Sequence, residues 1–191
     1  SLALDRGKVG RTGKGGEVQL NLRSASALWE WQGEALRGDP SLALVEHGEA
    51  RGTFRVPIPA RLPPTADRNG PLRATLAAQV QEKGLLTSLF PGLIRESRGE
   101  LRADLRVAGS LAEPQITGEM KLAGAGAYLP TAGIHVRDLE LSMGIEKELL
   151  RIDSFRAFSG PGRVEGKGQV RLRGWQVAGY SGSVEGDRFQ L

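Results

Sequence analysis

Histidine is the side chain best suited to proton transfer and zinc binding near neutral pH, and it occurs only twice in this chain of 191 residues. His47 and His135 lie far apart in the sequence, and neither belongs to a paired motif such as HExxH. A zinc site needs at least three protein ligands, so we interpret both histidines as surface or turn residues. Cysteine is absent, which excludes a disulfide framework, a thiolate nucleophile and a cysteine-ligated metal.

A glycine-rich segment at residues 10–16, GRTGKGG, superficially resembles a phosphate-binding loop. The motif GxxxxGK followed by Ser or Thr would require glycine at Lys8 and a hydroxyl residue at Gly15, so it does not fit. Residues 124–126 and 160–162 likewise lack the third glycine of a dinucleotide-binding fingerprint. These segments are predicted to be turns, and no cofactor is expected.

The acidic and aromatic residues form no catalytic set either. Glu146 and Glu148 flank Lys147 beside a predicted turn, which indicates a solvated hairpin tip rather than an acid–base pair. Trp29 and Trp31 share one face of any strand that contains them, and they are predicted to line a core or groove, with a binding platform as the alternative. The chain is therefore predicted not to be an enzyme, with no catalytic, cofactor-binding or metal site.

The elements that position the side chains are strands, because apolar and polar residues alternate along most of the chain. The alternating runs lie at residues 18–22, 54–62, 72–80, 101–107, 116–122, 136–143 and 164–172. Successive side chains on a strand point to opposite faces, so each run presents one apolar and one polar face. The pattern predicts an all-β, antiparallel sheet with one dry face and one wet face.

The dry face is the expected functional surface, because it would form a hydrophobic groove along the sheet. The apolar members of the later runs are predicted to line this groove: Leu72, Leu76, Val80, Leu101, Ala103, Leu105, Val107, Met120, Leu122, Val136, Leu141, Met143, Val164, Val170 and Leu172. A weak repeat, GRVEG at 162–166 and GSVEG at 182–186, is interpreted as two strands with their turns. It favours a solenoid-like or folded-ribbon sheet over a closed sandwich.

Two segments interrupt the alternation. Apolar residues recur at helical spacing between Leu85 and Ile94, which predicts one short helix or plug near 85–95, limited by Pro91 and resting on the dry face. Pro57 and Pro59 fall within an alternating run. Because proline donates no hydrogen bond to a neighbouring strand, they predict a sheet edge or a bulge there.

Composition restricts the class of protein further. With 27 Gly, 10 Pro and 39% hydrophobic residues, the chain suits many short strands joined by turns. The net charge of +4 comes from 26 basic and 22 acidic residues that are interspersed, which indicates solvated strand faces and not a nucleic-acid interface. No run of eighteen apolar residues and no secretory signal is present. Both ends read as strand, so residues 1–191 are expected to be a single segment of a longer repetitive protein.

The C-terminal half carries more specific residue patterns. Residues 89–93 (LFPGL) and 99–101 (GEL) precede residues 109–118, which follow the pattern Gly-Ser/Thr-Leu-x-x-Pro-x-hydrophobic-x-Gly throughout. Together with residues 129–155 and the glycine-marked turn at 159–168, they resemble the TamB family. TamB is the periplasmic subunit of the translocation and assembly module and is related to the AsmA-like, bridge-like lipid transfer proteins. The resemblance covers about residues 85–190, and residues 1–84 follow it by pattern only.

The resemblance implies an extended, tapered, U-shaped (taco-like) sheet whose concave face is apolar. It also implies a periplasmic protein anchored in the inner membrane through a segment not present here, with an outer-membrane barrel of the Omp85 type (TamA-like) as partner. The implied function is the shielding of lipid acyl chains during phospholipid transport between the two membranes, together with support of outer-membrane protein assembly. Burial of each CH₂ group gains about 0.8 kcal/mol, so a continuous dry groove is sufficient to carry lipid tails through water.

Two alternatives use the same residues. The first is a chaperone whose groove or edge strands bind unfolded outer-membrane or autotransporter proteins. The second is a structural β-solenoid stalk whose apolar face is filled by its own side chains. A covered apolar face would favour the stalk, whereas an open one would favour either binding function.

Overall fold

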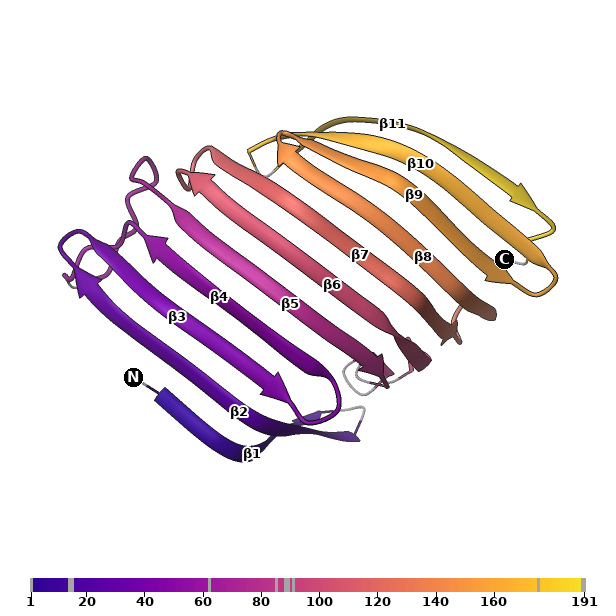
Figure 1. Ribbon diagram of the computed structural model, residues 1–191, viewed down its shortest axis with the longest axis horizontal. Helices are drawn as coiled ribbons and strands as arrows, with labels where there is room; N and C mark the ends of the chain where they lie inside the picture. Colours follow the sequence, from indigo (N-terminus) through magenta and orange to yellow (C-terminus); the bar gives the residue numbers. More distant parts are fainter. Residues whose placement is uncertain are drawn as a thin grey trace.

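The computed structural model describes residues 2–13, 16–61, 63–84, 86–87, 90, 92–174 and 176–189. The described residues form one antiparallel sheet of eleven strands, which follow one another in chain order (Figure 1). The strands are β1 (Leu2–Gly13), β2 (Gly16–Gln32), β3 (Ala35–Leu44), β4 (Gly48–Val56), β5 (Arg73–Lys83), β6 (Arg95–Gly109), β7 (Pro114–Leu129), β8 (Ile134–Lys147), β9 (Leu149–Ser159), β10 (Gly162–Arg173) and β11 (Gln176–Asp187).

Each strand pairs with the next one along the chain, so the sheet is a meander with β1 at one edge and β11 at the other. The sheet curves across its width, and the two ends of the chain lie at opposite sides of it (Figure 1). The predicted extended, curved, antiparallel all-β sheet is therefore confirmed.

Short glycine turns connect several of these long strands. Gln32 pairs with Ala35 and Ser159 with Gly162, which leaves two-residue loops that begin with Gly33 and Gly160. These two glycines have φ of 59° and 56°. Positive φ at the first loop position matches the twist of an antiparallel hairpin, and glycine adopts it without steric strain.

The predicted alternation governs which face each side chain occupies. On β6, Leu101, Ala103 and Leu105 are half-buried, whereas Arg102 and Asp104 between them are exposed. The same alternation continues on β7 and β8, the next two strands of the sheet. The apolar face is therefore the less exposed of the two, as expected on the inner side of a curved sheet.

Few apolar side chains are fully enclosed. Among the described residues, the buried apolar ones are Ala35, Leu44, Leu72, Ala125 and Ala157. Each strand makes its extensive contacts with its sheet neighbours and not with a second layer. The described part of the chain is thus a single-layer sheet, and no helix in it has the length and hydropathy needed to cross a bilayer.

The prolines at 57 and 59 end a strand rather than occupying an edge. β4 stops at Val56 and is an interior strand, hydrogen-bonded to β3 and to β5. The prediction of an edge strand or bulge over 54–62 is wrong, because the chain leaves the sheet before its first residue that cannot donate to the ladder. A hydrogen bond of 2.8 Å from Asp67 N to Pro57 O holds the loop between β4 and β5. Leu62, the last residue of the predicted run, lies outside the described residues.

The predicted helix between β5 and β6 is reduced to about one turn. Leu86 and Thr87 are helical, and the amide of Phe90 donates to the carbonyl of Leu86 over 2.9 Å. Leu86, Phe90 and Leu93 remain 39%, 48% and 56% exposed, so their side chains do not rest on the dry face as predicted. Leu85, Leu89 and Pro91, which also belonged to this prediction, lie outside the described residues, as do residues 14–15 of the glycine-rich segment.

The weak repeat at 162–166 and 182–186 proves to be the two halves of one hairpin. Val164 pairs with Gly186, and Gly166 pairs with Val184. An offset of 20 residues therefore spans adjacent strands β10 and β11, which pair with each other, and not two full strands with their turns.

Candidate functional site: the apolar face of the sheet

Strand pairing aligns the apolar side chains in rows that run across the sheet. Residues directly opposite each other on neighbouring strands point to the same face. One such row joins β5 to β11 and consists of Val80, Leu101, Leu122, Leu141, Phe155, Gly166 and Val184. We call the face that carries this row the apolar face.

Two further rows follow the first on the same face. The next one consists of Ala78, Ala103, Met120, Met143, Ile152, Gly168 and Gly182. The third consists of Leu76, Leu105, Gly118, Ile145, Leu150, Val170 and Tyr180. The rows run perpendicular to the strands, so the apolar surface is continuous across seven strands.

The predicted groove residues meet on this face. Those not in the three rows reach it through other pairs: Val107 opposite Ala74 and Ile116, Val136 opposite Ala127, Val164 opposite Ala157, and Leu172 opposite Val177. Leu72 precedes β5, and its amide donates to the carbonyl of Gly109 at the end of β6 over 2.8 Å. The structure therefore brings the set together, whereas its binding role remains a prediction.

Strand β9 contributes apolar residues that the alternation did not reveal. Ile152 and Phe155 both belong to the apolar face, although they are separated by an even number of intervening residues. The register of β8 and β9 shifts between Ser142 and Met143, so β9 accommodates an extra residue at this point. Such a bulge breaks the period of two, and only the strand pairing shows that both side chains share a face.

The apolar face extends to the N-terminal half through large exposed side chains. Trp29 pairs with Gly38, which in turn pairs with Phe54, while Trp31 pairs with Leu36. The two tryptophans are 47% and 48% exposed. They line an open surface and not a closed core, which fits the groove interpretation and equally the alternative of a binding platform.

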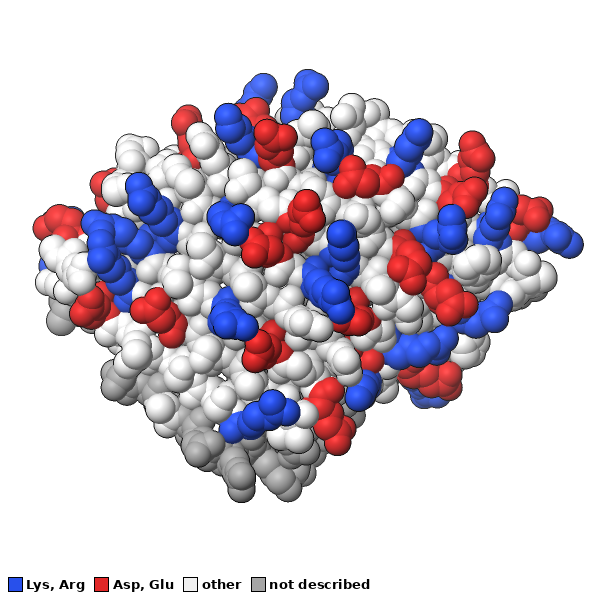
Figure 2. Space-filling view, viewed as in Figure 1, with Lys and Arg blue, Asp and Glu red and all other residues white. Residues whose placement is uncertain are grey.

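The opposite face is polar, and its charges form local ion pairs. Arginines pair with acids two residues away on their own strand, with N···O distances of 2.8 Å for Arg51–Glu49, 2.7 Å for Arg102–Glu100 and 3.1 Å for Arg106–Asp104. Figure 2 shows positive and negative side chains interspersed over most of this face. The interpretation of the charge pattern as solvated strand faces agrees with this distribution.

These ion pairs are expected to contribute little to stability. Replacing Arg106 by alanine should change the free energy of unfolding by less than about 1 kcal/mol, because both partners are exposed and screened by water. Urea unfolding of wild type and Arg106→Ala measures this difference. A loss of several kcal/mol would contradict the account of this face as a solvated surface.

The histidines lie in separate surroundings. His47 Nδ1 is 3.1 Å from the carbonyl oxygen of Gln81, to which it donates a hydrogen bond. The ring of His135 stacks on Tyr128, with 4.3 Å between the ring centres. In the described part of the chain, no three His, Cys, Asp or Glu side chains gather as metal ligands would.

The motif at 109–118 has a structural role in the β6–β7 hairpin. Gly109 takes a φ of 90°, the hydroxyl of Ser110 accepts a hydrogen bond from Glu113 N over 3.0 Å, and Pro114 opens β7 opposite Gly109. Gly118 has a φ of 141°, and a Cβ at this position would lie 2.0 Å from the carbonyl oxygen of Asp104. The motif thus sets the turn and a close approach of β6 and β7 within the third apolar row.

Comparisons of this chain with protein-family models, with curated proteins and with solved structures find no match.

Proposed function

We propose that this chain is a non-catalytic segment of a TamB-like periplasmic protein, anchored in the inner membrane, that shields phospholipid acyl chains during transport between the inner and outer membranes. Support of outer-membrane protein assembly, with an outer-membrane barrel of the Omp85 type as partner, belongs to the same proposal. The observation that carries it is the continuous apolar face, whose rows lie open along one side of a single-layer sheet. Besides this observation, the proposal rests on the resemblance of residues 85–190 to the TamB family.

The dimensions of the apolar face suit an extended acyl chain. Neighbouring strands lie about 4.8 Å apart, so the six steps from β5 to β11 span roughly 29 Å. One leaflet of a bilayer contributes about half of a hydrocarbon core that is about 30 Å thick. A single row is therefore long enough to cover an acyl chain along its length, at a gain of about 0.8 kcal/mol per CH₂ group removed from water.

Direct binding of a phospholipid tests this proposal. The purified chain, incubated with a phospholipid that carries a polarity-sensitive fluorophore on its acyl chain, should shift the emission towards that of an apolar environment. An unlabelled phospholipid should reverse the shift by competition, because both compete for the same rows. If the emission stays that of the aqueous probe at saturating protein, the lipid-shielding function is excluded for this segment.

The chaperone alternative is favoured by one specific observation, the backbone edge that β11 presents in the described part of the chain. There β11 pairs only with β10, and its side chains Val177, Tyr180 and Val184 are 63%, 86% and 72% exposed. An exposed edge offers backbone hydrogen bonds to an added strand. Titration with an unfolded outer-membrane protein separates the two functions. A competitor that displaces this protein but not the lipid probe would assign the client to the edge and the lipid to the face.

A further inference from the structure

At one end of the sheet, three arginines lie directly opposite one another on neighbouring strands. Arg37 of β3 pairs with Arg55 of β4, and Arg55 pairs with Arg73 of β5. With strands about 4.8 Å apart, the three Cβ atoms lie within roughly 10 Å of one another. Like charges in directly opposed positions repel and destabilise a sheet, so this arrangement calls for an explanation.

These three arginines lack the partners that arginines elsewhere on the polar face have. Arg51, four residues before Arg55 on the same strand and face, forms an ion pair with Glu49 of 2.8 Å. Among the described residues, the guanidinium groups of Arg37, Arg55 and Arg73 take part in no ion pair. The Nε atom of Arg37 is in addition buried without a hydrogen-bond partner. A buried N–H without an acceptor is unfavourable, so the position of the Arg37 side chain is not explained by its protein contacts.

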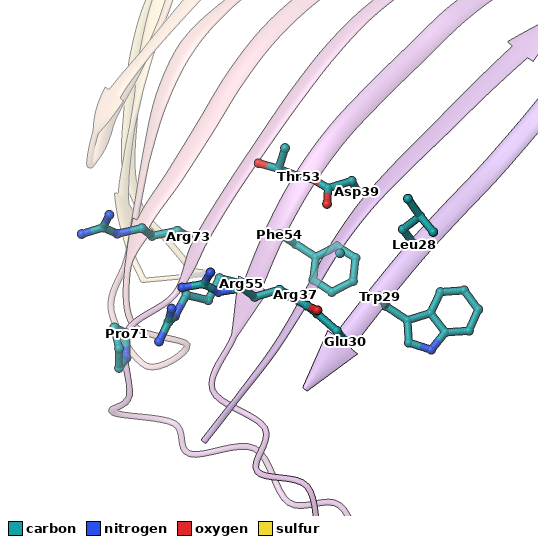
Figure 3. Close-up of a pocket in the computed structure, with 11 residues that line it drawn as sticks. Leu28, Trp29, Glu30, Arg37, Asp39, Thr53, Phe54, Arg55, Pro71 and Arg73 are labelled. Carbon is teal, nitrogen blue, oxygen red and sulfur yellow. The ribbon is translucent and has the colours of Figure 1, made fainter. Parts of the chain in front are cut away.

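The three side chains line a hollow of about 870 Å³ at this end of the sheet. Figure 3 shows them on adjacent strands beside the loop that carries Pro71. Two acids, Glu30 and Asp39, line the same hollow, so three positive against two negative groups leave a net charge of +1. The carboxylate of Glu30 accepts a hydrogen bond from the amide of Gln32 and not from an arginine.

We propose that Arg37, Arg55 and Arg73 bind a phosphate group. The planar guanidinium offers parallel N–H donors that match the oxygens of phosphate. Three guanidinium groups around one hollow donate hydrogen bonds to the anion, and its negative charge reduces the repulsion between them. The phosphate belongs either to a phospholipid head group or to a free phosphate ion. The arginines project from the polar side of the sheet, whereas Trp29 and Phe54, which also line the hollow, belong to the apolar face. Phosphate binding by the arginines does not require an acyl chain on the apolar rows.

Thermal unfolding of the intact chain tests the site with inorganic phosphate as the probe. Phosphate should raise the Tm of wild type above that measured in chloride at equal ionic strength, because binding to the folded state alone stabilises it. In Arg55→Ala the increase should disappear, and Arg51→Ala should keep it. Arg51→Ala is the matched control, since it removes the same charge from the same strand and face but leaves the arginine row intact. Equal phosphate effects in the two variants would overturn the proposal.

Vesicles distinguish the two sources of phosphate. Cosedimentation is measured with phosphatidylcholine vesicles alone and with vesicles that contain phosphatidic acid, whose phosphate is exposed. For a lipid head group, binding to the phosphatidic acid vesicles should fall at least tenfold in Arg55→Ala and less than twofold in Arg51→Ala. For free phosphate, the Tm effect should occur while both variants bind these vesicles as wild type does. If phosphate does not raise the Tm of wild type and Arg55→Ala binds the phosphatidic acid vesicles as wild type does, the site is refuted. Preserved binding of the acyl-chain probe in the same experiment would leave the proposed function standing.

Arg55→Lys provides a second readout. Lysine keeps the charge but lacks the forked donors, so the variant should retain less than a third of the wild-type affinity for phosphate. Full retention would show that charge alone accounts for binding and would contradict the proposed geometry.

Discussion

Replacing Leu122 by aspartate is expected to abolish binding of an acyl-chain probe while leaving the sheet folded. Leu122 lies in the first row of the apolar face, between Leu101 of β6 and Leu141 of β8. In the free protein this face is open to water, so the new carboxylate stays hydrated and the loss of stability is limited to about 1–3 kcal/mol of apolar contact. When an acyl chain covers the row, the same carboxylate must lose its water, which costs several kcal/mol.

The expected loss of affinity is therefore at least 100-fold, since each 1.4 kcal/mol corresponds to a factor of ten. Ser142→Asp is the matched control, because Ser142 adjoins Leu141 on β8 but lies on the polar face, opposite Lys121. It introduces the same charge and should bind the probe as wild type does. Fluorescence titration gives both affinities, and circular dichroism confirms the β-sheet content. Equal losses in the two variants would show that the apolar face does not bind the acyl chain.

Replacing Gly118 by alanine is expected to destabilise the fold by about 3 kcal/mol or more. The φ of 141° is unfavourable for any residue with a side chain, and the added Cβ would meet the carbonyl oxygen of Asp104 at 2.0 Å. Backbone, and not a flexible side chain, occupies the space, so β6 and β7 would have to separate at the centre of the sheet. The loss should appear as a lower urea midpoint.

Gly179→Ala is the control for this prediction. Gly179 lies on β11 and does not have positive φ, and a Cβ added there would meet no atom within 4 Å. Alanine at this position should be neutral or stabilise by up to about 1 kcal/mol, because it restricts the unfolded chain. A similar loss of stability in both variants would mean that the close approach at Gly118 is not what requires glycine.

Much of the architecture follows from local pattern. The alternation around Leu101 to Val107 predicts both the strand and its inward face, because the period of two leaves no other arrangement with one dry side. The same reasoning fails at Pro57, where an alternating run continues in the sequence but the strand stops. Alternation records which side chains are apolar, whereas strand length depends on whether each amide can join the ladder.

The parts of the site that escaped prediction depend on pairing between distant residues. Ile152 and Phe155 share a face only because the β8–β9 register shifts. The arginine row is likewise invisible in the sequence, because Arg37, Arg55 and Arg73 stand opposite one another only after β3, β4 and β5 have paired. No property of a single residue identifies such positions, because the strand register determines which side chains lie next to one another.

Photo-crosslinking at neighbouring positions of one strand tests the central claim most directly. A photoreactive amino acid at Ala103 projects from the apolar face, and the same group at Arg102 projects from the polar face of β6. After illumination with phospholipid, mass spectrometry should detect a lipid adduct at position 103 and none at position 102. Adducts of equal yield at both positions, or none at position 103, would contradict the account of the apolar face as the lipid-shielding surface.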